Sequence, residues 1–235
     1  MKKAWSRLEG ASQDPAITLL VLFPLALVHL TGRGAVPSAA YSLVENVLLA
    51  FGGGSTLVLG MLLFFAALWA LGRIHSLALP WRAGAVFSIL EGILWGILLH
   101  PALAWLTSAL SDGRSLSWGQ RDDLGGSLAL AAGAGLYEEL LFRAFLFGWV
   151  FTAIKFLLRL FGWGNAASGP AWVVGLLVSS CLFSLAHGWG DPSQLDAPVL
   201  LFRFLAGVLL GLLYSWRGLA VVAYAHASYN ALILL

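Results

Sequence analysis

Charged residues are scarce in this 235-residue chain, in which aspartate, glutamate, lysine and arginine together make up 10% of the positions. A soluble domain usually carries about 25%. With 60% hydrophobic residues and a mean hydropathy of +0.88, the chain lacks the polar groups needed to cover a water-exposed surface. The net charge is only +2, and the sequence has no basic cluster of the kind that binds nucleic acid. The composition therefore predicts an integral membrane protein.

Cysteine and long polar segments are also nearly missing. The single cysteine, Cys181, excludes an internal disulfide and a cysteine-ligated zinc cluster. No stretch is polar and long enough for a soluble domain, and the sequence shows no repeat. We therefore interpret residues 1–235 as one transmembrane domain.

Long apolar runs fill the rest of the chain and predict an all-α bundle of about seven transmembrane helices, with six to eight accepted. Short segments rich in turn residues separate them. The predicted spans are residues 16–31, 43–72, 84–107, 124–160, 171–187, 197–215 and 218–235. The second and fourth are longer than one span needs, and whether the fourth is one helix or two stays open.

The distribution of basic residues predicts a cytoplasmic N-terminus. With that orientation, the cytoplasmic side has more lysine and arginine than the outer side, as the positive-inside bias requires. The cytoplasmic set is Lys2, Lys3, Arg7, Arg73, Arg82, Lys155, Arg159 and Arg217, against Arg33, Arg114 and Arg121 outside. The predicted location is a prokaryotic cytoplasmic membrane.

The fourth apolar run contains charges that need an explanation. The stretch "GLYEELLFRAFLFGWV" at 135–150 holds Glu138, Glu139 and Arg143, and one charge at mid-membrane depth costs roughly 2.5–3.5 kcal/mol on insertion scales. On an α-helix, Glu139 and Arg143 lie about 40° apart and can pair. Glu138 points elsewhere and is left for a proton-transfer role; a polar knot that holds helices together is the structural alternative.

Two later spans add polar groups that suit hydrolysis. His187 ends "CLFSLAHGWGD", and "AVVAYAHASYN" carries His226 and Asn230 four residues apart on one helix face. A carboxylate, two histidines and an asparagine can activate water and stabilise an oxyanion. No hydroxyl nucleophile with a partner base stands out, and we interpret Ser179, Ser180 and Ser184 as packing residues.

These segments resemble the motifs of a known family. "EELLFR" (138–143) fits EExxxR, "FSLAH" (183–187) fits FxxxH and "HASYN" (226–230) fits HxxxN. Their order resembles that of the CPBP family of intramembrane proteases, also called the CAAX-protease or Abi family, which includes Rce1-like endopeptidases. The resemblance covers residues 124–235, interpreted as the catalytic core, and leaves residues 1–123 as spans without an assigned role. The glycine usual after the first motif is Ala144 here.

The resemblance implies an intramembrane endopeptidase with its active site inside the helix bundle. It would cut a membrane-associated protein near its anchored, lipidated or C-terminal end. By this analogy, Glu138 and His187 activate water, and His226 and Asn230 donate to the oxyanion. Glu139, Arg143 and Phe183 would support the site.

Three alternatives accompany this prediction. We expect no cofactor, but zinc bound by Glu138, His187 and His226 is an alternative mechanism. A non-catalytic peptide-binding or bacteriocin-immunity protein is a second alternative, and a proton-coupled transporter is a third. The complete residue set argues against the second, and the convergence of the polar residues on one place argues against the third.

The remaining polar residues of the spans receive simpler interpretations. His29, His75 and His100 match no motif and are interpreted as interfacial or packing residues. Glu91 is a second isolated carboxylate within a predicted span, and Arg203 is its candidate partner.

Overall fold

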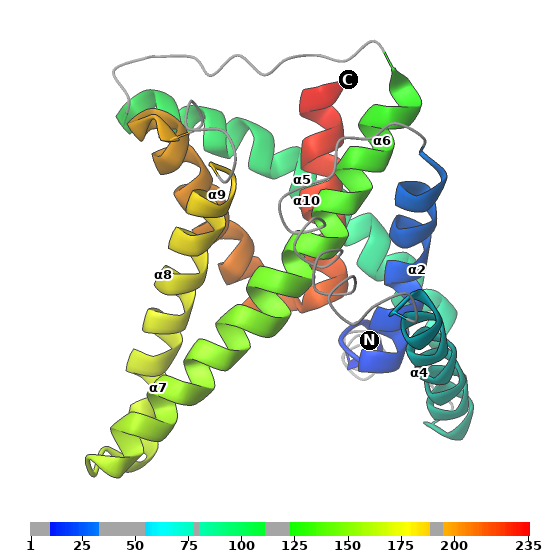
Figure 1. The fold of residues 1–235 in the computed structure, drawn as a ribbon, viewed down its shortest axis with the longest axis horizontal. Coiled ribbons are helices and arrows are strands. Elements are labelled where there is room, and N and C mark those ends of the chain that lie inside the picture. Colours follow the sequence, from blue (N-terminus) through cyan, green and yellow to red (C-terminus); the bar gives the residue numbers. More distant parts are fainter. Residues whose placement is uncertain (1–9, 33–54, 78–79, 111–122, 189–194) are drawn as a thin grey trace, which may run out of the picture.

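The structure is a computed structural model in which residues 10–32, 55–77, 80–110, 123–188 and 195–235 are described. All regular elements in this part of the chain are helices, which confirms the predicted all-α class (Figure 1). They are α2 (Pro15–Thr31), α4 (Ser55–Leu77), α5 (Trp81–Leu110), α6 (Leu124–Gly133), η1 (Ala134–Phe147), α7 (Gly148–Leu160), η2 (Gly164–Ala167), α8 (Ser168–Ala186), α9 (Ala197–Arg217) and α10 (Leu219–Leu234). A helix corresponds to each predicted span, although residues 43–54 of the second prediction lie outside the described residues.

Helices α6, η1 and α7 form one continuous rod, which answers the question left open for the fourth span. The backbone stays right-handed helical at Ala134 and at Gly148, where the segments join. The rod has 37 residues, or about 55 Å at 1.5 Å per residue. That length exceeds the roughly 30 Å of a bilayer core, so the rod must tilt or extend beyond it. In Figure 1 it crosses the molecule diagonally.

The middle of this rod, η1, is a π-helix rather than the expected α-helix. A π-helix closes its hydrogen bonds five residues apart, is uncommon beyond a single turn and occurs frequently at functional sites. Its buried side chains include Glu138, Glu139 and Arg143. The sequence pattern gave no sign of this change in helix type.

Helix α10 lies at the centre of the molecule and packs most extensively against α5. Two glycines of α5 make this close approach possible. A Cβ atom at Gly92 would lie 2.8 Å from the carbonyl oxygen of Val221, and one at Gly96 would lie 2.6 Å from that of Ala225. From a third helix, α2, Val21 accepts a hydrogen bond of 3.0 Å from the Tyr224 hydroxyl. The N-terminal spans therefore enclose α10.

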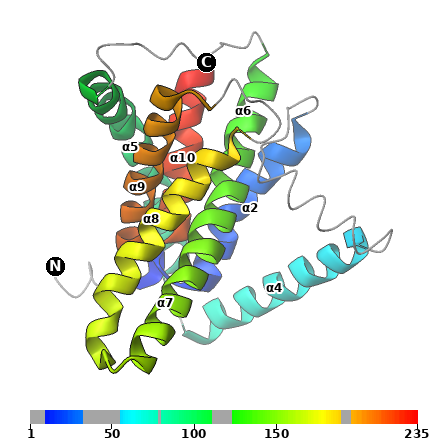
Figure 2. The same ribbon diagram turned by 60° about the vertical axis from the view of Figure 1, so that its left-hand side comes forward.

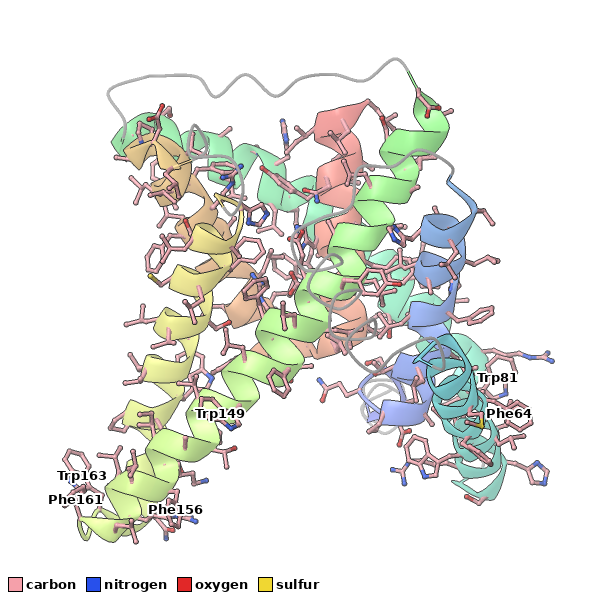
Figure 3. All side chains as sticks on the ribbon, in the orientation of Figure 1. Phe64, Trp81, Trp149, Phe156, Phe161 and Trp163 are labelled. Carbon is pink, nitrogen blue, oxygen red and sulfur yellow. The ribbon has the colours of Figure 1, made fainter. Side chains whose placement is uncertain are left out.

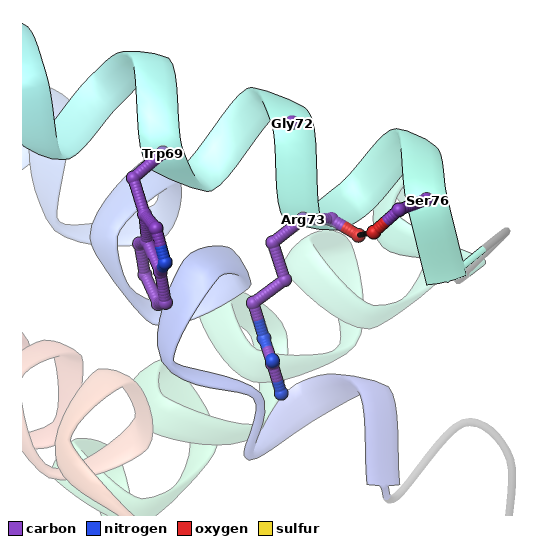
Figure 4. A pocket seen from close by; sticks show the side chains of 4 residues that line it. All are labelled: Trp69, Gly72, Arg73 and Ser76. Atoms are coloured by element: carbon purple, nitrogen blue, oxygen red, sulfur yellow. Dashed lines mark hydrogen bonds between the residues drawn. The ribbon is translucent and has the colours of Figure 1, made fainter.

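Helices α7 and α8 form an antiparallel hairpin at one side, and α4 extends away from the body at another (Figure 2). Arg73 of α4 reaches back to Asp14, the N-cap of α2, in an ion pair of 2.9 Å. A shallow, open pocket of about 420 Å³ is lined by Trp69, Gly72, Arg73 and Ser76 on α4 (Figure 4). It contains none of the predicted site residues.

The surface of the described residues is that of a membrane protein. Four helices are long and apolar enough to cross a bilayer, namely Trp81–Leu106, Leu124–Leu160, Gly164–Ala186 and Ala197–Arg217; two further apolar helices, Pro15–Thr31 and Leu219–Leu234, are shorter. Large aromatic side chains point outward, among them Trp149 on α7 and Phe161 and Trp163 at the end of the α7–α8 hairpin (Figure 3). Lipid is the solvent that suits such a surface.

Candidate active site

The two adjacent glutamates of η1 are buried together in the protein interior. Glu139 is 0% exposed, Arg143 1% and Glu138 4%. Groups this buried require partners, because an uncompensated charge in a low-dielectric interior is costly. The partners come from η1 itself, from α9 and from the two later motif helices, α8 and α10.

Glu139 and Arg143 form the ion pair predicted from their spacing. Nη1 of Arg143 lies 3.0 Å from Oε1 of Glu139. Nη2 of Arg143 donates to the Gly207 carbonyl oxygen of α9 over 3.4 Å. The same Glu139 oxygen also faces Nδ1 of His226 at 2.7 Å, a contact that the sequence did not predict. Glu139 therefore joins Arg143 to helix α10.

Glu138 lies between the two motif histidines. Its Oε2 atom is 3.5 Å from Nε2 of His187 and 3.9 Å from Nε2 of His226. Among the described residues, this oxygen has no direct hydrogen-bond partner. Glu138, His187 and His226 thus converge from η1, α8 and α10 on one place, as the three motifs indicated.

The second ring nitrogen of each histidine is held by an acceptor. Nδ1 of His187 lies 2.8 Å from the Phe183 carbonyl oxygen, and Nδ1 of His226 faces the Glu139 carboxylate. A carbonyl oxygen only accepts, and so does a carboxylate that is paired with an arginine. Both Nδ1 atoms therefore donate, which turns both Nε2 atoms toward Glu138.

The Phe183 ring occupies the middle of this cluster. The Arg143 guanidinium lies over its face at 4.3 Å from the ring centroid, within the range of a cation–π interaction. The rings of His187 and His226 pack edge-on against it, with centroid distances of 4.8 and 5.9 Å, and Phe142 does so at 5.3 Å. Phe183 therefore packs against Arg143 and both histidines of the site.

Asn230 lies one turn beyond His226 on α10 and is half-buried. Its side chain has no hydrogen bond to the other site residues in the described part of the chain. The structure therefore places it on the helix that carries His226 without joining it to the cluster.

Small residues bring the site helices together. A Cβ atom at Gly135 of η1 would lie 2.5 Å from the Ala223 carbonyl oxygen of α10, so only glycine permits this approach. The serines of α8 have the packing role expected of them. Each hydroxyl donates to a backbone carbonyl: Ser179 to Phe142, Ser180 to Leu176 and Ser184 to Leu200.

The Glu91 prediction was wrong in its partner. Glu91 of α5 pairs with Arg217, the last residue of α9, through contacts of 2.6 and 2.7 Å. The side chain of Arg217, which the topology prediction counts on the cytoplasmic side, is 4% exposed. Sequence spacing could not show this contact, because the partners lie 126 positions apart.

A cluster of two carboxylates, an arginine and two imidazoles inside apolar helices marks a candidate functional site, because ionisable side chains are rare in membrane spans. Residues 121–232, just under half of the chain, match the family model described as type II CAAX prenyl endopeptidase, Rce1-like. The match indicates a peptidase, and together with the apolar helices it supports an intramembrane protease in general. Searches of the curated proteins and of the solved structures found no match.

Proposed function

We propose that the protein is an intramembrane endopeptidase that hydrolyses a peptide bond near the membrane-anchored or C-terminal end of a membrane-associated protein. The observation that carries this proposal is the position of Glu138 Oε2, which faces Nε2 of His187 at 3.5 Å and Nε2 of His226 at 3.9 Å. Both distances exceed a direct hydrogen bond, and they suit three groups that address one water molecule.

Glu138 and His187 are the proposed general-base pair. Glu138 takes a proton from the water as the water oxygen attacks the scissile carbonyl carbon. His187 orients the water by accepting a hydrogen bond from it at Nε2, since its Nδ1 donates to the Phe183 carbonyl oxygen. The proton then passes to the leaving amine when the C–N bond breaks, which leaves a new carboxyl group and a new amino group.

His226 and Asn230 are the proposed donors to the oxyanion. Asn230 donates through its amide. His226 can donate from Nε2 only when both ring nitrogens carry protons, because Nδ1 already donates to Glu139. Glu139 is then the counterion of His226, and Arg143 and Phe183 hold Glu139 and the two imidazoles in place. Preorganised donors of this kind are usually a large part of catalysis in acyl transfer.

Zinc is the alternative way to activate the water. Among the described residues, no group of three or more histidine, cysteine, aspartate or glutamate side chains is arranged to hold a metal ion. We therefore propose the metal-free mechanism and derive no step through a metal. The zinc content of the purified protein separates the two mechanisms.

The match to a peptidase family model favours an enzyme over the non-catalytic alternatives. An immunity protein that binds a peptide without cutting it would not need His187 and His226 to face Glu138 with their Nε2 atoms. The proposed location is a prokaryotic cytoplasmic membrane with the N-terminus in the cytoplasm. Reporter fusions at both ends of the chain test that orientation.

The test compares host membranes that contain the native protein with membranes that contain Glu138→Gln, at matched expression and thermal stability. We expect a defined set of membrane proteins to keep C-terminal or anchored fragments only in the variant. Those fragments then define the substrate class. Identical fragment profiles would contradict proteolysis by Glu138 and would favour a binding role.

A further inference from the structure

Glu91 and Arg217 form the tightest ion pair among the described residues that lies within apolar helices. Oε1 of Glu91 lies 2.6 Å from Nε of Arg217, and Oε2 lies 2.7 Å from Nη2. Such a two-point contact fixes direction as well as distance. The side chains are 15% and 4% exposed, so water screens the pair little.

The pair lies where α9 turns into α10. Arg217 ends α9, and Gly218, with a φ of 84° that favours glycine, is the one residue between the two helices. Gly92, the neighbour of Glu91, packs against Val221 in the first turn of α10. Glu91 therefore lies beside the N-terminus of α10.

Helix α10 has no local groups that would stabilise its N-terminus. Its first turn contains no acidic residue, and no side chain caps it. A carboxylate near a helix N-terminus and a cation in the last turn of a helix are both favourable. Glu91, which lies on α5, places a carboxylate near the N-terminus of α10. Arg217 places a cation in the last turn of α9.

Aromatic rings add to the hold on Arg217. Its guanidinium lies 5.7 Å from the Phe87 ring of α5 and 5.8 Å from the Trp216 ring, and Trp216 packs edge-on against Trp95 of α5 at 5.8 Å. The α9–α10 turn is therefore attached to α5 by charge and by ring contacts together.

We propose that Glu91 is a positioning residue of the active site: by holding Arg217 it fixes the start of α10, and thereby the position of His226 relative to Glu138. This inference rests on the proposed function. A rigid helix carries the constraint over the seven helical steps from Leu219 to His226, about 10 Å. Glu91 lies outside the family match of residues 121–232. The N-terminal part of the chain thus contributes a residue that positions the active site.

Stability alone is a weak reason to keep such a pair in an apolar setting. A well-packed hydrophobic pair is often as stable as a buried ion pair or more stable, whereas a single buried charge without its partner is strongly destabilising. A hydrophobic pair lacks the directional two-point contact. This difference allows positioning to be separated from stability by experiment.

Three variants make the test. Glu91→Gln breaks the ion pair, and the double variant Glu91→Leu with Arg217→Met removes both charges and keeps the packing. Arg73→Gln is the control, because it breaks another ion pair, the Arg73–Asp14 pair of 2.9 Å, which includes neither Arg217 nor a residue of α10. Thermal unfolding in detergent identifies the variants that keep the fold.

The first readout needs no substrate. In the ¹⁵N spectrum of histidine-labelled protein, His226→Gln assigns the His226 ring signals. We expect those signals to shift or broaden in Glu91→Gln and in the folded double variant, and to stay in place in Arg73→Gln. Unchanged His226 signals in a folded Glu91 variant would overturn the inference, whatever the fate of the proposed function.

The second readout is kinetic and uses as its probe a synthetic peptide of a membrane-protein tail that accumulates with Glu138→Gln. We expect kcat of both Glu91 variants to fall about ten- to a hundredfold, with KM within about twofold, and kcat of Arg73→Gln to stay native. A double variant that recovers both stability and kcat would show a purely structural pair and overturn the inference. Loss of activity in Glu138→Gln but not in the Glu91 variants would leave the proposed function intact and overturn this inference alone.

Discussion

Nδ1 of His226 lies 2.7 Å from Oε1 of Glu139, the same oxygen that Arg143 contacts at 3.0 Å. One carboxylate oxygen thus connects the first sequence motif to the third. This contact orients the imidazole toward Glu138, so the second glutamate of the motif acts on the site through His226 as well as through Arg143. The two neighbouring glutamates therefore differ in role.

Substitution of the two glutamates should separate activity from stability. Glu138→Gln should abolish proteolysis and change stability little, because Oε2 of Glu138 has no direct hydrogen-bond partner among the described residues. Glu139→Gln leaves the buried Arg143 without its counterion and should cost about 3–5 kcal/mol. Thermal unfolding of both proteins in the same detergent measures the difference. Equal stability of the two variants would contradict the assignment of the ion pair to Glu139.

Phe183→Leu should lower activity more than its loss of packing explains. The ring lies under Arg143 and against both histidines, and leucine cannot make the cation–π contact. Phe147→Leu is the control, since Phe147 is also buried but packs on Trp172 and Tyr214. We expect both variants to lose about 1–2 kcal/mol of stability and only Phe183→Leu to lose about tenfold or more in kcat. A similar kcat in the two variants would reduce Phe183 to a packing residue.

Gly96→Val should destabilise the α5–α10 interface. A Cβ atom there would lie 2.6 Å from the Ala225 carbonyl oxygen and would also clash with Ser228, and such overpacking typically costs about 1–3 kcal/mol. Gly148→Ala is the comparison, because no atom lies within 4 Å of a Cβ at that position. Alanine in this helix should stabilise the protein by about 0.5–1 kcal/mol. Opposite shifts in the unfolding temperature are the expected result, and a neutral Gly96→Val would show that the two helices can separate.

The Asp14–Arg73 pair should give stability that disappears in acid. Partial burial raises the pKa of the Asp14 carboxyl, but hydrogen bonds from Arg73 and from the Ala16 amide outweigh it and lower the pKa below its ordinary value of 3.8. Since the folded-state pKa is the lower one, the stabilisation is complete above the unfolded-state value and is lost as the pH falls through the folded-state value. The stability difference between the native protein and Arg73→Gln should thus be constant near neutral pH and close below about pH 3.8. A difference that persists at the lowest pH would contradict this origin.

Chelation should leave the enzyme active. Purified protein treated with a strong chelator should keep its proteolytic rate and contain far less than one zinc ion per chain. The contradicting result is zinc bound one to one, lost in both His187→Gln and His226→Gln, with activity restored only by added metal. That result would replace the metal-free mechanism with zinc bound by Glu138, His187 and His226.

Much of the fold and of the site could be predicted from the sequence, because hydropathy and motif order are local properties. Apolar runs located the helices, and the three motifs named the side chains that converge on Glu138. The spacing of Glu139 and Arg143 gave their ion pair, even though η1 proved to be a π-helix. The roles assigned to Glu138, His187, His226 and Asn230 stay predictions until activity is measured.

The contacts that escaped prediction join residues far apart in the chain. His226 and Glu139 are 87 positions apart, and Arg217 and Glu91 are 126 apart. Helical periodicity places a side chain on a face but does not say which helix that face meets. Arg203 was therefore as good a candidate for Glu91 as Arg217, and only the packing of α5 on the α9–α10 turn decides between them.

The most direct test of the central claim is cleavage of a tail peptide by purified protein reconstituted in liposomes, followed by mass spectrometry in ¹⁸O-labelled water. The native protein should cut one bond and place one ¹⁸O atom in the new carboxyl group. Glu138→Gln, folded to the same stability, should give no product above the background rate. Cleavage at an undiminished rate by Glu138→Gln would contradict the account, because another group would then have to activate the water.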